Sequence, residues 1–270
     1  MTTSSSDQSA SSIPAADCEI LEHLPFSLGS GVGARARIGL IVLQSDYTIE
    51  HELRTLLTPL KCVDFYVSKV SNDLHVTPAT LAAMGPRIAA SAEQLLTAGD
   101  LQVIAYGCTS ASVVLGPARV AEYVHETRPD VAVSNPITAA FAALNHIGAK
   151  RIGVLTPYTR DVNTGVREAF TNNGFDVPVF GSFNEPNDAR VAAIDAISLR
   201  NAVVMLAERA PLDAVFVSCT SIRLVDEVHA LEDTVGLPVI SSNMALAWHC
   251  LRLAGVADAI PGYGTLLAGS

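Results

Sequence analysis

An internal repeat is the feature of this sequence that most limits the folds open to it. Three segments of the first half recur in the same order in the second half: RIGLIVLQ at Arg37 and RIGVLTPY at Arg151, AYGCTSASVVL around Cys108 and VSCTSIRLV around Cys219, VAVSNPITAAFAALNHIGA around Asn135 and PVISSNMALAWHCLRLAGV around Asn243. Ordered self-similarity of this kind indicates a duplicated structural unit. We therefore expect two similar halves that face each other across one cleft on a pseudo-two-fold axis.

Within each half, short apolar runs alternate with longer segments of helical periodicity. This alternation predicts parallel sheets with helices on both faces. Strands are expected over Ile38–Leu43, Val63–Val67, Val103–Tyr106, Ala132–Ser134, Ile152–Leu155, Ala214–Val217 and Val239–Ile240. Helices are expected over Thr48–Leu57, Pro78–Leu96, Ala111–Val124, Ile137–Ile147, Val162–Asn172, Asp188–Glu208, Ile222–Val235 and Met244–Ala254. The expected fold class is α/β, with two pseudo-symmetric doubly wound half-domains, and in such folds ligands bind beyond the carboxyl ends of the strands.

The first 34 residues differ in composition from the rest, being rich in serine and then in proline and glycine. We interpret residues 1–34 as a flexible tail. The GSGVG run at its end precedes the first expected strand, whereas a phosphate-binding loop follows a strand and opens a helix, so we interpret the run as a linker. Residues 35–270 then form a two-lobed region, with about 35–135 and the segment from about 243 as one lobe and about 136–242 as the other.

The composition argues against several classes of protein. The formal net charge of −10 disfavours a surface that binds nucleic-acid phosphates or anionic lipid. No apolar run approaches the roughly 18 to 20 residues of a membrane-spanning helix, and the N-terminus lacks a signal-peptide pattern. We expect a soluble, cytoplasmic homo-oligomer whose partner is a small molecule, with no nucleic acid and no membrane.

The five cysteines are an odd set without CxxC spacing, which disfavours both a disulfide framework and a zinc cage. Cys108 and Cys219 each follow an apolar strand, precede an expected helix and are followed by Thr and Ser. A single free cysteine in such a place is most often a small buried hydrophobe, but its recurrence in both halves favours a function. Cys62 and Cys250 are interpreted as packing residues, and Cys18 lies in the tail.

None of the seven histidines has metal-ligand spacing, and the following are expected at the surface or in helix packing: His51, His75, His146, His229 and His249.

A turn from a strand into a helix provides unpaired backbone N–H groups, the positive end of a helix dipole and hydroxyls suited to capping. Such a turn can lower the pKa of a cysteine below its usual value of about 8.5. The same N–H groups can hold a carboxylate or an enediolate oxygen. Each Cys-Thr-Ser turn is therefore expected to be an anion site with a reactive thiol inside it.

Several motifs resemble those of one known superfamily. The GCTS and SCTS turns, LTPY at residues 155–158 and PVISSNMALAWH are similar to the aspartate/glutamate racemases. Within that superfamily the chain resembles the maleate cis-trans isomerase and arylmalonate decarboxylase group, and most of all the ectoine-utilisation A proteins, which share LQSDYTIEHE and GSF.E.NDARVA. The likeness covers roughly Arg37 to Gly255. It implies the two-lobed fold of the superfamily, and an enzyme without a cofactor or a metal that acts on a carboxylate beside an activated carbon.

The resemblance also implies a role for individual residues. Cys108 and Cys219 match the two catalytic cysteines. The residues that match substrate-binding positions are Thr109, Ser110, Tyr158, Thr220 and Ser221. Three further binding positions depart from the pattern, because Gln44 and Asp46 stand in the first-strand loop where an Asn is usual and Asp188 replaces another Asn.

An amide can donate a hydrogen bond to a carboxylate, whereas an ionised Asp can only accept one. If Asp46 and Asp188 line the cleft, the pocket favours an amino-acid-like substrate, such as an ectoine or hydroxyectoine breakdown product, over a dicarboxylate such as maleate. Asp46→Asn is then expected to improve maleate binding. Both residues are equally suited to a simpler role as helix caps before Thr48–Leu57 and Ala189.

Two thiols on opposite sides of one carbon or double bond predict a racemase, an epimerase or a cis-trans isomerase. A decarboxylase of the arylmalonate type is the alternative, since it needs only one thiol as proton donor. A non-catalytic carboxylate-binding protein would also have two α/β halves, but it has no use for a matched pair of thiols.

Overall fold

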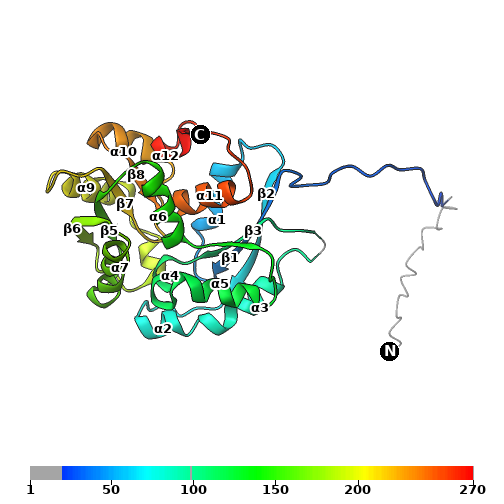
Figure 1. The fold of residues 1–270 in the computed structure, drawn as a ribbon, viewed down its shortest axis with the longest axis horizontal. Helices are drawn as coiled ribbons and strands as arrows, with labels where there is room; N and C mark the ends of the chain where they lie inside the picture. The colour runs from blue at the N-terminus through cyan, green and yellow to red at the C-terminus, as the bar shows by residue number, and fades with distance from the viewer. Residues whose placement is uncertain (1–19, 98, 270) are drawn as a thin grey trace, which may run out of the picture. The chain divides into compact units, whose positions relative to one another are not determined.

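Two parallel four-stranded sheets, one from each half of the repeat, form the centre of the fold. A computed structural model of the chain describes residues 20–97 and 99–269, and divides the chain into two units, Met1–Gly31 and Val32–Ser270. The strands of the first sheet lie in the order β2-β1-β3-β4 and those of the second in the order β6-β5-β7-β8. The identical order confirms the doubled α/β fold, and Figure 1 shows the two sheets next to each other in the second unit.

The eight strands are short and their side chains are largely buried. Their bounds are β1 Ala36–Leu43, β2 Val63–Val70, β3 Val103–Gly107, β4 Ala132–Ser134, β5 Arg151–Thr156, β6 Asp176–Ser182, β7 Ala214–Val217 and β8 Val239–Ser241. The central strands β1, β3, β5 and β7 are nearly continuous apolar runs, as strands covered on both faces require. Seven of the strands match the expected ones, whereas β6 lacks the apolar run by which the others were found.

The helices cover the sheets. Their bounds are α1 Ile49–Leu57, α2 Pro78–Ala82, the 3-10 turn η1 Gly85–Arg87, α3 Ile88–Glu93, α4 Thr109–Leu115, α5 Pro117–His125, α6 Pro136–His146, α7 Arg160–Asn172, α8 Asp188–Val191, α9 Ala196–Ala207, α10 Val228–Val235, α11 Ser242–Leu253 and α12 Gly264–Ala268. Figure 1 shows α1 and α11 on one side of the first sheet, with α3 and α5 on the other.

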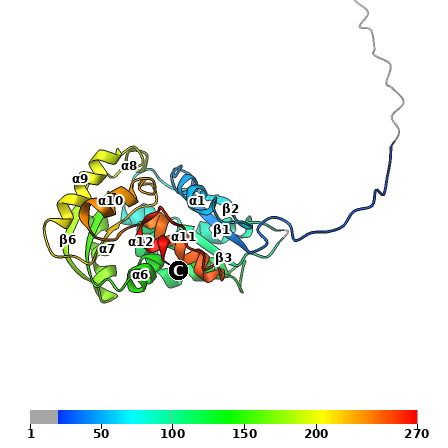
Figure 2. The ribbon, with the colours of Figure 1, turned by 90° about the horizontal axis from the view of Figure 1, so that it is seen from above.

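Helix α11 connects the two halves. It follows β8 of the second sheet, but it packs against α6 and α1 and against β3 and β4 of the first sheet. Both views show α11 beside α6 (Figures 1 and 2). Its side chains from Ser242 to Leu251 are buried except for the half-buried His249, as the position between two sheets demands. The lobe boundaries expected from the sequence stay a prediction.

Three helices that were expected to be continuous are broken, and each break has a local cause. Gly85-Pro86 interrupts the expected helix over Pro78–Leu96, because proline cannot donate to the preceding turn. Gly116, with a φ of 84°, ends α4 immediately before Pro117 opens α5. The third break ends at Asp195, whose side chain accepts a hydrogen bond from the backbone N–H of Ser198 and caps α9.

The expected helix over Ile222–Val235 begins later than predicted. The chain after Cys219 runs through turns, and α10 starts only at Val228. This delay distinguishes the second half from the first, where α4 begins immediately after Cys108.

The described part of the N-terminal segment has no regular secondary structure. Residues 20–31 contain no helix or strand. Cys18 and most of the predicted tail lie outside the described residues, so the tail stays a prediction. In the part of the chain that the structure describes, no helix has the length and apolar character needed to cross a membrane.

Candidate active site

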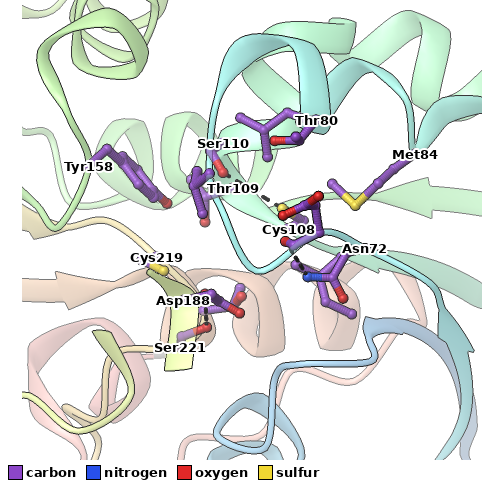
Figure 3. Close-up of a pocket in the computed structure, with 15 residues that line it drawn as sticks. Asn72, Thr80, Met84, Cys108, Thr109, Ser110, Tyr158, Asp188, Cys219 and Ser221 are labelled. Carbon is purple, nitrogen blue, oxygen red and sulfur yellow. Dashed lines mark hydrogen bonds between the residues drawn. The ribbon is translucent and has the colours of Figure 1, made fainter. Parts of the chain in front are cut away.

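A small pocket lies beyond the carboxyl ends of the strands, where turns from both halves meet. Cys108 follows β3 of the first sheet and Cys219 follows β7 of the second, and both line this pocket. Figure 3 shows the two cysteines with Tyr158 and Asp188 around the same space. The complete lining is Leu43, Asn72, Asp73, Val76, Thr80, Leu81, Met84, Cys108, Thr109, Ser110, Tyr158, Asp188, Cys219, Thr220 and Ser221.

Cys108 is the N-cap residue of α4 and is only 4% exposed. Its Sγ lies 3.8 Å from the Oγ of Ser110 and is also approached by the backbone N–H of Ala111. Burial, together with the nearby carboxylates of Asp188 and Asp46, nevertheless raises the pKa of the thiol to about 12. The expectation of a lowered pKa is therefore wrong for Cys108, because desolvation outweighs the N–H groups.

Cys219 has a different backbone from Cys108. Its φ is 107°, a region that residues other than glycine rarely adopt, and no helix begins beside it. Burial and Asp188 raise the pKa of its thiol, while the Ser221 N–H and the Tyr158 hydroxyl act in the opposite direction. The expected helix N-terminus is thus present at Cys108 but absent at Cys219.

The two threonines after the cysteines bind across the boundary between the halves. The hydroxyl of Thr109 donates to the Oγ of Ser242 at 2.9 Å, and the same Oγ accepts the N–H of Cys219 at 3.1 Å. The hydroxyl of Thr220 donates to the carbonyl oxygen of Gly107 at 3.3 Å. Thr109 and Thr220 therefore line the pocket with hydroxyls that are already engaged in holding the two turns together.

Asp188 is 5% exposed and lies in the pocket between the two halves. One carboxylate oxygen accepts the hydroxyl of Ser45 at 2.5 Å, and the other accepts the hydroxyl of Ser221 at 2.8 Å. Asn72 extends this network, since its Nδ2 donates to the Oγ of Ser45 at 2.8 Å. The side-chain cap of α8 is Asn187, so Asp188 lines the cleft and is not merely a helix cap.

Neither Gln44 nor Asp46 is part of the pocket lining. Gln44 is exposed, whereas Asp46 is buried close enough to both thiols for its carboxylate to raise their pKa values. The Oδ1 of Asp46 accepts the backbone N–H groups of Thr48 and Ile49 at the start of α1, which is the capping role. Burial raises the pKa of Asp46, and hydrogen bonds from the N–H groups of Ile49 and Thr48 and from the Thr220 side chain oppose this rise. This placement does not support a role of Gln44 in substrate binding, whereas the role of Asp46, which is buried beside Thr220 and Asp188, stays a prediction.

Tyr158 follows β5 and is buried beside both thiols. Its hydroxyl lies next to Ser218 and Cys219 without a hydrogen bond of normal geometry among the described residues, and Figure 3 shows it directed at the pocket. Burial and the two nearby thiols raise its pKa well above the usual value, so the phenol is neutral. An unpaired buried hydroxyl is costly, and a bound substrate oxygen would satisfy it.

Sequence reasoning missed the segment between β2 and α3, which supplies Asn72, Thr80 and Met84 to the pocket. The segment follows the carboxyl end of β2, where ligands bind in parallel sheets, and that position was the available signal. Its residues have no counterpart among the repeated motifs, so the comparison of the two halves could not reveal them.

The remaining cysteines and histidines fit a structural role with one exception. The described cysteines are all free, and Cys250 is buried as expected. Cys62 is exposed with a φ of 61°, so its interpretation as a packing residue is wrong. The expected surface or packing histidines are exposed, except His249, which is half-buried and lies 2.8 Å from the Oγ of Ser134. Within residues 20–97 and 99–269, no cluster of His, Cys, Asp and Glu is arranged to hold a metal ion.

Comparison with known proteins agrees with this geometry. The model of the arylmalonate decarboxylase family matches residues 62–267. The chain belongs to this family. A maleate isomerase from Geobacillus stearothermophilus is 28% identical over 247 residues, covering 86% of this chain and 97% of that protein. An arylmalonate decarboxylase from Bordetella bronchiseptica is 31% identical over 131 residues, covering 48% of this chain and 55% of that protein.

Solved structures extend the comparison. A structure of the maleate cis-trans isomerase of Nocardia farcinica, a cysteine-to-serine mutant with a covalently bound succinylcysteine intermediate, has a TM-score of 0.76 at 26% identity. The match covers 86% of this chain and 98% of that one. Membership of the arylmalonate decarboxylase family and these relatives establish an enzyme of the isomerase or decarboxylase type, and this sets the binding-protein alternative aside.

Proposed function

We propose that the chain is a cofactor-independent racemase or cis-trans isomerase of a small carboxylate that also carries a nitrogen group. Cys108 and Cys219 are the two reacting thiols. The observation that carries the proposal is that these cysteines, one from each half of the repeat, line a single pocket. A decarboxylase needs only one proton donor, so the second thiol favours an isomerase.

Two reactions fit this pair, and both balance without a further reagent. In a racemisation, the thiolate of one cysteine takes the proton from the α-carbon, the electron pair moves into the carboxylate to form an enediolate, and the other thiol donates its proton to the opposite face. In a cis-trans isomerisation, the thiolate adds to one alkene carbon, the new single bond rotates, and the C–S bond breaks to release the trans alkene and the thiolate.

The raised pKa values favour the protonated form of both thiols, so formation of the reacting thiolate depends on the N–H groups beside each sulfur atom. Because burial disfavours both charged forms, the donor thiol stays protonated, and a thiolate formed opposite it is a strong base. The N–H groups of Ala111 and Ser221 face the two sulfur atoms and stabilise whichever thiolate forms. The neutral Tyr158 hydroxyl is available to donate to a substrate oxygen.

The wall around Asp188 supports one class of substrate. No Lys or Arg belongs to the described lining, and the Asp188 carboxylate faces the space between the thiols. A second substrate carboxylate beside Asp188 would repel it, whereas an ammonium or amide group would donate to it. This supports an amino-acid-like substrate, and an ectoine or hydroxyectoine breakdown product combines a carboxylate with nitrogen groups. Cytoplasmic location and a homo-oligomeric state stay predictions.

The decisive experiment is incubation with a panel of carboxylates in deuterated water, with NMR detection of deuterium at the α-carbon. We expect deuterium uptake into an amino-acid-like carboxylate if the reaction is a racemisation, and conversion to the trans alkene without uptake if it is a cis-trans isomerisation, in both cases without loss of carbon dioxide. Release of carbon dioxide from a substituted malonate would instead support the decarboxylase.

Maleate provides the sharpest comparison within the panel. Turnover of maleate by the unmodified protein should be poor, and Asp188→Asn should improve maleate binding because an amide can donate to a carboxylate. Glu50→Gln is the matched control, since Glu50 pairs with Arg54 and Lys69 at the surface of α1 and is not part of the pocket lining. Efficient maleate turnover by the unmodified protein would contradict the substrate class but leave the two-thiol chemistry in place.

A further inference from the structure

A buried carboxylate outside the pocket connects the first half of the molecule to the turn that carries Cys219. Glu52 lies on α1, is 3% exposed and is absent from the pocket lining. Among the described residues it forms no ion pair; three N–H donors surround it instead. Burying a carboxylate this deeply costs free energy unless such donors replace the lost hydrogen bonds to water. These contacts are therefore needed to keep Glu52 in its place.

The contacts of Glu52 all lead to the chain that follows Cys219. Its Oε1 accepts the backbone N–H groups of Leu224 at 2.6 Å and Val225 at 2.8 Å. Its Oε2 accepts the Nδ2 of Asn243 at 2.6 Å, and the same Nδ2 donates to the carbonyl oxygen of Thr220 at 2.8 Å. Thr220 is the residue next to Cys219, so Glu52 holds both ends of the segment from 220 to 225.

This segment needs an outside partner because it is not a helix. After Cys108, the helix α4 begins at once and its own hydrogen bonds fix the turn. After Cys219, no helix begins before Val228, and Cys219 itself has a φ of 107°. The carboxylate of Glu52 thus replaces, for the second turn, the helical order that stabilises the first.

We propose that Glu52 is a positioning residue for Cys219, acting through the backbone of Leu224 and Val225 and through Asn243 without touching the substrate. The proposal rests on the catalytic role proposed for Cys219. Glu52→Gln keeps the size of the side chain, but it removes the charge and turns an NH₂ group toward the Nδ2 of Asn243, so that a donor faces a donor.

The test compares the alkylation rates of the individual cysteines by iodoacetamide in the full-length protein. Trypsin places each cysteine in its own peptide, with Cys108 in residues 88–119 and Cys219 in residues 210–223, so mass spectrometry can follow both at once. Glu50→Gln is the matched control, because Glu50 lies on the same helix but pairs with Arg54 and Lys69 at the surface.

We expect Glu52→Gln to raise the alkylation rate of Cys219 roughly tenfold relative to Cys108, the effect of weakening one hydrogen bond to a charged group that keeps the turn closed. Glu50→Gln should leave both rates unchanged. An equal increase at both cysteines would mean general loosening and would overturn the proposal, as would an unchanged rate at Cys219.

Activity gives a second readout in the deuterium-exchange assay. Glu52→Gln should lower kcat more than it raises KM, since it displaces a reacting thiol but leaves the pocket lining intact. Alkylation needs no substrate, so a protein without exchange activity but with a selective change at Cys219 would contradict the proposed function and still support the structural role of Glu52. A raised KM with an unchanged kcat would overturn the positioning role.

Discussion

The two cysteine turns occupy equivalent places in the repeat but are built differently. Cys108 has an extended backbone and leads directly into α4, whereas Cys219 has a positive φ and leads into a stretch of turns. The first turn depends on local helical order, and the second depends on Ser242, Asn243 and Glu52. The two halves thus share the strand order and the thiols, but they differ in the contacts that hold each thiol in place.

The largest effect is expected from removing either thiol. If Cys108 and Cys219 are the two reacting thiols of the proposed reaction, Cys108→Ser and Cys219→Ser should each lower turnover by about 10²- to 10⁴-fold. Steady-state turnover of the substrate identified by deuterium exchange measures this. If one of the two variants keeps full activity, the halves are not equivalent in function and the one-thiol decarboxylase gains support.

The second prediction concerns the pH dependence of stability. Burial raises the pKa of Glu52 from its ordinary 4.5 to about 7, so the folded protein binds this proton more tightly than the unfolded chain does. The resulting stability is complete below about pH 4.5 and is lost as the pH rises through about 7, a loss of about 3 kcal/mol in the free energy of unfolding.

Urea unfolding at pH 5 and pH 8 measures this loss, and Glu52→Gln should abolish it. Glu50→Gln is again the control: its pKa is lowered, with burial opposed by hydrogen bonds and charges from Lys69 and Arg54, so its contribution is lost only in more acidic solution. An identical pH dependence of the free energy of unfolding in all three proteins would show that the loss of stability does not come from the titration of Glu52.

The third prediction uses the residues that precede the two cysteines. A Cβ on Gly107 would lie 2.7 Å from the Cδ1 of Ile49 and 3.2 Å from the carbonyl oxygen of Ile41, so Gly107→Ala should destabilise the protein by about 1–3 kcal/mol. Ser218, its counterpart, already has a Cβ there, and its buried hydroxyl lies near the Tyr158 hydroxyl without a hydrogen bond of normal geometry among the described residues.

Ser218→Ala should therefore be close to neutral in the same unfolding measurement, because it removes an unpaired polar group without changing the backbone. A similar cost for both substitutions would mean that the first half is not packed more tightly behind its cysteine than the second.

The sequence predicted the features that depend on local pattern or on repetition. The strands β1, β3, β5 and β7 were visible as apolar runs, and the paired thiols were visible because Cys108 and Cys219 recur in the same context. The Gly116-Pro117 break was also written in the sequence, since both residues disfavour the interior of a helix. Had the expected helix over Ala111–Val124 been ended at this pair, the prediction would have matched α4 and α5.

The features that the sequence could not predict arise from contacts between distant residues. Ser45 and Asp188 meet although 143 positions separate them, and 191 positions separate Glu52 from Asn243. Nothing local distinguishes Asp188, which lines the pocket, from Asp46, which caps a helix, because both lie at the start of a helix. The lowered thiol pKa was wrong for a related reason, since burial depends on the packing of both halves.

The smallest expected effect tests the backbone difference itself. Replacing either cysteine by glycine removes a small buried side chain, which should cost a similar amount at both sites. At Cys219, however, glycine also relieves the positive φ of 107°, whereas at Cys108 the extended backbone offers no such relief. Cys219→Gly should consequently destabilise the protein by about 1 kcal/mol less than Cys108→Gly in urea unfolding. Equal costs would mean that the turn after β7 accommodates its conformation without strain, and the divergence of the two halves would then lie in their hydrogen bonds alone.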